Sequence, residues 1–326
     1  MKDNIYCPLA FHGLYVERHP DTGYSISPCC LCEKSSNKTG LIDFNDTYLT
    51  EIRNKFRNGV KPDECRQCWD LEDNGGESKR LVYADQQQET YHDTLHYLDY
   101  NTMPICNARC VICSPKYSST WANYLGVKSA TNIVKNDYNY LKELDLREVK
   151  SIYFNGGEPL LTREHIMVLQ QVGDLSAVDI SYNTNGSCYP DDTAINIWNN
   201  CGSVTIFFSV DGIEDRFEET RPPLKWAAVS SNIEKINLLK NINIGCSYTI
   251  GMHNIFDLSD TINWFSGLPN FDVYTQFHVH HVTADHELYF NGISADDQIL
   301  FLREMLKFIK FHWCASIINC LKNATI

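Results

Sequence analysis

The sequence has no long apolar segment, since no window approaches the roughly eighteen apolar residues needed for a membrane-spanning helix. Its first residues also lack the basic start and apolar core of a secretory signal. Basic residues are few, with 28 Lys and Arg against 41 Asp and Glu, and the formal charge of −13 repels a phosphate backbone. We therefore expect a cytoplasmic protein with neither a membrane nor a nucleic-acid partner.

The remaining composition is that of a globular protein. With 43% hydrophobic and 21% charged residues, the 326-residue chain is long enough for one large domain and a small one. A polar stretch rich in turn residues runs through 73–77 and 85–90. We place the boundary there and predict domains at 1–85 and 95–326.

Cysteine is abundant, and its spacing is typical of metal ligands. Nine of the fourteen cysteines precede residue 114, two of them adjacent, in C-x2-C and C-x3-C-x2-C groupings. The cytosol keeps thiols reduced, which favours iron-sulfur or zinc binding over disulfides. We interpret the scattered remainder as small buried apolar residues: Cys188, Cys201, Cys246, Cys314 and Cys320.

Short apolar runs alternate with helical patterns after residue 95. Predicted strands cover 95–100, 151–154, 178–182, 204–210, 242–250 and 271–279. Between them, Thr162 can cap one helix, and apolar residues recur at helical spacing over 229–239. A terminal amphipathic helix is predicted over 296–321, with an apolar end that either packs on the protein or forms an interface. The pattern predicts an α/β fold with a six-stranded parallel β/α sheet.

Polar motifs follow four successive strands. The run Pro104-Ile-Cys-Asn-Ala-Arg-Cys-Val-Ile-Cys113 follows the first, Asn155-Gly-Gly-Glu-Pro159 the second, Asn183-Thr-Asn-Gly186 the third and Ser209-Val-Asp-Gly212 the fourth. Sites in parallel β/α folds lie at these strand ends. Three thiolates are one short of a four-cysteine site and leave a metal position open. We therefore predict an active site there.

Together these motifs resemble the radical S-adenosylmethionine (SAM) superfamily, which has C-x3-C-x-Φ-C after the first strand of a six-stranded partial (TIM-like) barrel and GGEP after the second. The resemblance extends over essentially the whole chain. It implies that Cys106, Cys110 and Cys113 hold a 4Fe-4S cluster whose open iron chelates SAM. Reductive cleavage of SAM then gives a 5′-deoxyadenosyl radical that abstracts hydrogen from a substrate.

The same resemblance implies a set of SAM-binding residues. Gly156 and Gly157 let the backbone approach the methionine end of SAM, Glu158 accepts from its ammonium, and Pro159 stiffens the turn. Ile112 stands where many members have an aromatic ring and can pack on adenine. Hydrogen bonds to ribose or to the SAM carboxylate are implied for Asn185, Ser209 and Asp211, and pairing with that carboxylate for Arg221.

Zinc is the alternative for the three cysteines, completed by a distant ligand such as His278, His280 or His281. The Gly-Gly-Glu-Pro motif at the next strand end argues against it, because zinc needs no such partner. The histidines alternate along a predicted strand, so His280 faces opposite to His281. That alternation favours a mixture of core and cavity positions over a metal triad.

The first eighty residues resemble the auxiliary-cluster module called SPASM or, in its shortened form, twitch. The resemblance implies a cysteine-rich twitch-like domain in which Cys7, Cys29 (or Cys30), Cys65 and Cys68 ligate an auxiliary iron-sulfur cluster. Five residues separate Gly23 from Cys29 where similar modules have four, so Cys29, Cys30 and Cys32 all remain candidates. A four-cysteine zinc knuckle is the alternative.

We thus predict a radical SAM enzyme with an undefined substrate. Relatives with auxiliary modules commonly modify peptides or proteins, which favours a peptide-like substrate and implies a reductant such as flavodoxin or ferredoxin. The alternatives are a radical SAM enzyme acting on a small metabolite, sugar or nucleotide, and a non-enzymatic zinc-binding module. No general base or radical-quenching residue can be named, because alternation leaves the facing of five candidates open: Tyr153, Tyr182, Tyr248, Cys188 and Cys246.

Overall fold

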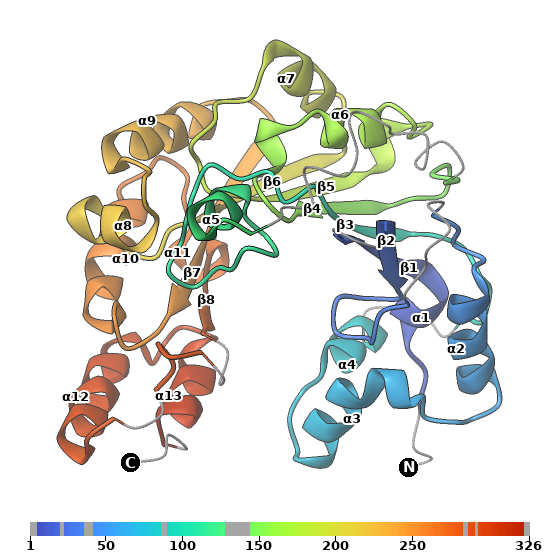
Figure 1. The fold of residues 1–326 in the computed structure, drawn as a ribbon, viewed down its shortest axis with the longest axis horizontal. Coiled ribbons are helices and arrows are strands. Elements are labelled where there is room, and N and C mark those ends of the chain that lie inside the picture. Colours follow the sequence, from blue (N-terminus) through green and yellow to red (C-terminus); the bar gives the residue numbers. More distant parts are fainter. Residues whose placement is uncertain are drawn as a thin grey trace.

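The computed structural model describes residues 5–19, 23–35, 42–85, 90–127, 144–282, 286–290 and 293–322. Its centre is one eight-stranded sheet with the order β2-β1-β3-β4-β5-β6-β7-β8. The sheet bends into an open arch, with α6, α7 and α9 on its convex side (Figure 1). None of the helices within these ranges is long and apolar enough to span a bilayer.

Six of the strands form the predicted parallel β/α barrel segment, in chain order. They are β3 (Tyr97–Asn101), β4 (Ser151–Asn155), β5 (Asp179–Thr184), β6 (Ser203–Ser209), β7 (Ile242–Ile250) and β8 (Phe277–His281). Alternation sorts their side chains, since Ile152 and Phe154 are fully buried whereas Ser151 and Tyr153 are only half-buried. The buried set packs under the helices, and the other set faces the interior of the arch.

Two further strands, absent from the sequence prediction, come from the N-terminal region. Strand β1 (Gly13–His19) pairs in parallel with β3, and β2 (Gly23–Ser27) pairs antiparallel with β1 at the sheet edge. The N-terminal region therefore continues the barrel sheet. Residues 86–89, within the predicted boundary, lie outside the described ranges.

Helices cover the sheet and its two ends. Helix α2 is amphipathic, because Leu49, Ile52 and Phe56 on one face are buried, and Gly59, past the helix end, has φ of +72°. The α-helices are α1 (Pro8–His12), α2 (Thr47–Arg57), α3 (Arg66–Asp73), α4 (Lys79–Ala84), α5 (Ser119–Leu125), α6 (Glu164–Leu169), α7 (Asp192–Trp198), α8 (Glu214–Thr220), α9 (Trp226–Asn237), α10 (Leu258–Ser266), α11 (Val273–Gln276), α12 (Ala295–Met305) and α13 (Cys314–Lys322).

Several boundaries differ from the prediction. Helix α6 begins at Glu164, with Arg163 rather than Thr162 at its N-cap. Strand β8 begins at Phe277, because Asp272 caps the short helix α11 just before it. The single terminal helix predicted over 296–321 is divided into α12, the 3-10 turn Leu306–Phe308 and α13.

The break in the terminal helix has a packing cause. Trp313 is buried and donates from Nε1 to the carbonyl oxygen of Phe277 at 3.1 Å, which ties the break to β8. Cys314 and Ile317, in the first turns of α13, are buried as well. The apolar end of the chain therefore packs on the barrel edge.

Candidate active site

The loop that carries Cys106, Cys110 and Cys113 leaves β3 and is fixed on two sides. On one side, Thr102 donates to the Asn155 carbonyl at 2.8 Å, and the Glu158 amide donates to Ile105 at 2.8 Å. On the other, the amides of Arg109 and Val111 donate to the carbonyls of Pro222 (2.6 Å) and Thr220 (2.9 Å). The loop is thus held between the end of β4 and the end of α8.

Burial disfavours the charged form of all three thiols. It raises the pKa of Cys106 to about 12 and of Cys113 to about 11, and it raises that of Cys110 as well. Their negative charges would also repel one another, which adds to the pKa of Cys106 and Cys113. A bound cation is therefore needed to hold them as thiolates at neutral pH.

The three thiols do not converge as ligands of one ion. Over the described part of the chain, no three His, Cys, Asp or Glu side chains gather into such a group. A 4Fe-4S cluster takes each cysteine on a different iron, so its ligands surround the cluster rather than meet at a point. A lack of convergence is therefore compatible with a cluster at this loop.

Gly156 and Gly157 allow the end of β4 to approach the cysteine loop closely. Gly156 has φ of +116°, and a Cβ there would lie 2.4 Å from Asn101 Oδ1. A Cβ on Gly157 would lie 2.5 Å from the Ile105 carbonyl oxygen. In this structure the two glycines make room for the chain leading to Cys106, a contact that the sequence did not indicate.

Glu158 is fully buried and joins the ends of β4 and β5. Its Oε2 accepts from the Asn185 amide at 2.6 Å, and its Oε1 accepts from Thr184 Oγ1 at 2.7 Å and from the Leu160 amide at 3.2 Å. Burial raises the pKa of this carboxyl, while these donors oppose the rise. Pro159 is buried beside it and starts the 3-10 turn Pro159–Leu161.

Asn185 faces the first cysteine of the loop. Its Nδ2 lies 3.8 Å from Cys106 Sγ and donates to Asn107 Oδ1 at 3.0 Å. Its Oδ1 accepts from the Ser187 amide at 2.9 Å, which fixes the orientation of the side chain. The third strand end and the cysteine loop are therefore in contact.

Arg221 and Asp211 form a buried ion pair against the second cysteine. Arg221 Nη2 lies 2.6 Å from Asp211 Oδ2, and Nη1 donates to Cys110 Sγ at 3.4 Å. Asp211 Oδ1 accepts from the Thr249 amide at 2.8 Å. Ser209 is half-buried at the end of β6, and Ile112 is half-buried against the core.

The N-terminal cysteines meet at a second place. Five of them line one small cavity beneath α1, together with Lys79 and Arg80: Cys7, Cys29, Cys32, Cys65 and Cys68. Cys32 and Cys65 approach to 3.8 Å between sulfurs. Cys30 is outside this cavity, exposed, and accepts from Lys79 Nζ at 3.2 Å. Burial raises the pKa of Cys7 and of Cys29 to about 12, so these thiols also need a cation to ionise at neutral pH.

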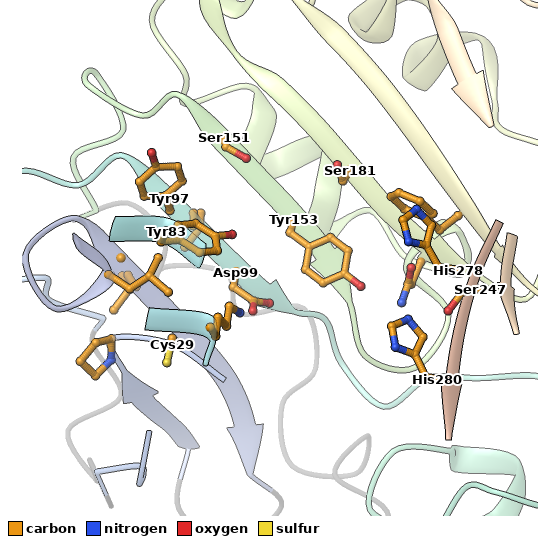
Figure 2. Close-up of a pocket in the computed structure, with 18 residues that line it drawn as sticks. Cys29, Tyr83, Tyr97, Asp99, Ser151, Tyr153, Ser181, Ser247, His278 and His280 are labelled. Atoms are coloured by element: carbon orange, nitrogen blue, oxygen red, sulfur yellow. The ribbon is translucent and has the colours of Figure 1, made fainter. Parts of the chain in front are cut away.

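Beside the N-terminal cysteine group lies a cavity of about 350 Å³ inside the arch (Figure 2). Inward-facing residues of β3 to β8 form most of its wall, and Figure 2 shows Asp99 and Tyr153 opposite His278 and His280. Cys29 and Lys79 line both this cavity and the cysteine cavity. A molecule bound here would therefore touch the edge of the N-terminal cysteine group.

The cavity wall carries opposite charges that are not paired with each other. Within the described residues no ion pair of 4.0 Å or less joins Asp99 to Lys79. Burial raises the pKa of Asp99 to about 6, against the lowering effects of Lys79 and of the amide of Asn155, which donates to it at 2.6 Å. Burial lowers the pKa of His278 and His280, so both are neutral at pH 7. The wall is a polar surface with hydrogen-bonding groups.

Alternation now resolves the facing of the tyrosines and histidines. Tyr153, His278 and His280 line the cavity, while His281 points away and is exposed. Tyr182 and Tyr248 belong to the buried layer under the helices. The sequence analysis did not predict that Asp99 and Lys79 line a cavity. The period-two alternation of Tyr97 and Asp99 could have indicated Asp99, whereas no local pattern indicates Lys79.

The chain matches one protein-family model and is similar to several solved structures. The family model described as Radical SAM superfamily matches residues 100–265, and no curated protein matches the chain. Native anSMEcpe with bound AdoMet is 16% identical with a TM-score of 0.45, covering 65% of this chain and 59% of that one. Streptococcus suis SuiB bound to S-adenosylmethionine is 11% identical with a TM-score of 0.46, covering 91% and 69%. The chain thus spans less than two thirds of anSMEcpe.

Proposed function

Because the chain belongs to the radical SAM superfamily, we propose that Cys106, Cys110 and Cys113 bind a 4Fe-4S cluster and that the protein cleaves SAM reductively. When bound, the cluster and SAM supply a 5′-deoxyadenosyl radical for hydrogen abstraction. The observation that carries the proposal is the family match over 100–265, which contains the fixed cysteine loop and the Asn185 and Arg221 contacts to it.

The chain's own residues would orient SAM at the strand ends. Asn185 and Arg221 both reach the cysteine loop and carry donors for a carboxylate or a ribose hydroxyl. Ser209 and Ile112 are half-buried near the same strand ends and loop, and we assign them the hydroxyl and adenine contacts. Glu158 accepts from two backbone amides and from Thr184 Oγ1, and we propose that it holds Asn185 in place.

For the N-terminal group, we propose an auxiliary iron-sulfur cluster in a twitch-like region. Five buried or half-buried thiols around one cavity supply the four ligands that such a cluster needs. This assignment favours Cys29 or Cys32 over the exposed Cys30. We propose flavodoxin or ferredoxin as the reductant class.

We propose that the substrate enters the 350 Å³ cavity inside the arch, whose wall includes Cys29 of the N-terminal cysteine group. A peptide is the preferred substrate, with one side chain in the cavity, by analogy with superfamily members that carry auxiliary modules. A small metabolite is the second candidate. The cavity volume lies in the range of small-molecule sites, and the wall offers hydrogen-bonding groups.

The decisive experiment is anaerobic reconstitution followed by addition of dithionite and SAM, with iron, sulfide and 5′-deoxyadenosine measured per chain. About eight irons with product support both clusters, and about four irons with product support the active-site cluster alone. Cys110→Ala should abolish 5′-deoxyadenosine while retaining the auxiliary iron. Zinc without product, or full product in Cys110→Ala, would refute the proposal.

The substrate class can be read from hydrogen transfer. The reduced protein is incubated with SAM and with separate peptide and small-metabolite fractions from perdeuterated cells. Deuterium in 5′-deoxyadenosine identifies the fraction that contains the substrate, because only a bound substrate delivers its hydrogen to the radical. Labelling by the metabolite fraction alone would reject the peptide preference.

A further inference from the structure

We propose that Arg221 sets the reduction potential of the active-site cluster by donating a hydrogen bond to the sulfur of Cys110, an inference that rests on the proposed function. The guanidinium lies against the thiol, with Nη1 3.4 Å from Sγ. The side chain of Cys110 is buried, so water does not compete for this sulfur. Neither Cys106 nor Cys113 has a charged donor among the described residues.

The guanidinium is fixed in this position. Asp211 binds Nη2 at 2.6 Å, and side-chain exposure is 7% for Arg221 and 1% for Asp211. Asp211 is anchored in turn, because its Oδ1 accepts from the Thr249 amide at 2.8 Å and its carbonyl accepts from Asn254 Nδ2 at 3.1 Å. Arg221 therefore cannot swing into solvent without breaking a buried ion pair.

A fixed cation at a ligand sulfur has a defined electronic effect. Reduction adds negative charge to a cluster and its sulfurs, and a charge-assisted donor stabilises that added charge. The surrounding apolar packing strengthens the interaction, since little solvent screens it. Arg221 should therefore raise the reduction potential and make the cluster easier to reduce.

The same side chain has a whole nitrogen, Nε, left for SAM. Arg221 Nε is buried and has no hydrogen-bond partner among the described residues, while Nη1 and Nη2 are engaged. A SAM carboxylate at Nε would be joined through one guanidinium to Cys110. SAM affinity and cluster potential should thus change together when Arg221 is replaced.

The test is a redox titration of the reconstituted holoprotein without SAM, in which electron paramagnetic resonance measures the reduced cluster. The spectral change on adding SAM identifies the signal of this cluster. In Arg221→Gln the reduced-to-oxidised ratio at a fixed potential should fall at least tenfold, which corresponds to about 59 mV for one electron. The matched control is Arg216→Gln, which removes the same charge from α8 but loses only Asp257 and Glu219 as partners, and its potential should equal wild type.

A second variant separates tuning from folding. Arg221→Gln leaves Asp211 as an unpaired buried charge, whereas the double variant Asp211→Asn, Arg221→Gln removes both charges. The double variant should fold, and because it also removes the opposing charge of Asp211 its potential should lie between those of Arg221→Gln and wild type. A wild-type potential in either variant would overturn the inference while leaving the function intact if wild type still forms 5′-deoxyadenosine; absence of a cluster in wild type would overturn the function itself.

Discussion

Gly157 sits where the backbone of the cysteine loop passes, so its missing side chain has a steric purpose. A Cβ there would lie 2.5 Å from the Ile105 carbonyl oxygen and 2.7 Å from that of Met103, and neither backbone atom can move freely. We expect Gly157→Ala to cost about 1–3 kcal/mol, the usual range for overpacking, and to reduce iron retention at Cys106. Urea unfolding and iron counts measure both; Gly173→Ala, where a Cβ meets nothing within 4 Å, is the control.

Cys30 and Cys32 offer a second prediction at this scale. Cys30 is exposed and outside the cysteine cavity, whereas Cys32 is 3% exposed and inside it. We expect Cys30→Ala to keep the auxiliary iron and Cys32→Ala to lower it, as measured by iron and sulfide per chain after reconstitution. Wild-type iron content in both variants would leave Cys29 as the ligand from this segment. Loss of iron in Cys30→Ala alone would contradict the assignment.

Residue types were easier to predict than their partners. The cysteine spacing singled out both cysteine groups, but adjacent Cys29 and Cys30 differ only in which way the chain turns them. The resemblance implies a SAM contact for Asp211, and the structure adds that its carboxylate binds Arg221 and the Thr249 amide. Such choices depend on segments distant in sequence, which local patterns do not encode.

Strand β1 connects both cysteine segments through a single carboxylate. Glu17 is buried, and its oxygens lie 2.7 Å from Lys34 Nζ and 2.9 Å from Lys116 Nζ. Burial would raise the pKa of Glu17, but the two ion pairs outweigh it and leave the pKa below its usual range. Lys34 follows Cys32, and Lys116 follows Cys113, so β1 holds the ends of both segments.

This geometry predicts a specific acid response. Because the pKa of Glu17 is lowered on folding, its stabilisation is present above about pH 4.3 and is lost as the pH falls through the lowered value. Glu17→Gln should cost about 1–2 kcal/mol at neutral pH, a modest figure since both lysines are partly exposed, and should flatten the acid slope. Urea unfolding of metal-free wild type and Glu17→Gln from about pH 7 to about pH 3 measures the free energy of unfolding against pH. The same acid slope in both proteins would contradict this prediction.

Helices and strands with a sustained apolar period could be predicted from the sequence. Short elements that form by pairing with another part of the chain could not. Helices α2 and α9 and strands β3 to β7 follow the apolar pattern, because each buries one face over several turns or pleats. Strand β1 forms because β3 offers its edge, from Gly13↔Tyr97 to Glu17↔Asn101. The terminal helix breaks because Trp313 reaches β8, a contact set by the whole barrel.

At the scale of the molecule, the continuous sheet predicts the behaviour of a shortened chain. Residues 95–326 were predicted as a domain, and the pairing of β1 with β3 means that a chain beginning at residue 90 would expose β3 as an unpaired edge. We expect such a chain to aggregate, as measured by size-exclusion chromatography beside the full chain. A stable monomer with unchanged circular dichroism of the barrel would show that the barrel folds independently.

The shared sheet also has a kinetic consequence. Both cysteine groups are attached to strands of one hydrogen-bonded layer, the N-terminal group through β1 and β2 and the active-site loop through β3. Within the described residues β1 pairs directly with β3, so strand pairing would set the gap that an electron crosses between the two proposed clusters. Electron exchange between the two sites should therefore follow a single rate, insensitive to solvent viscosity.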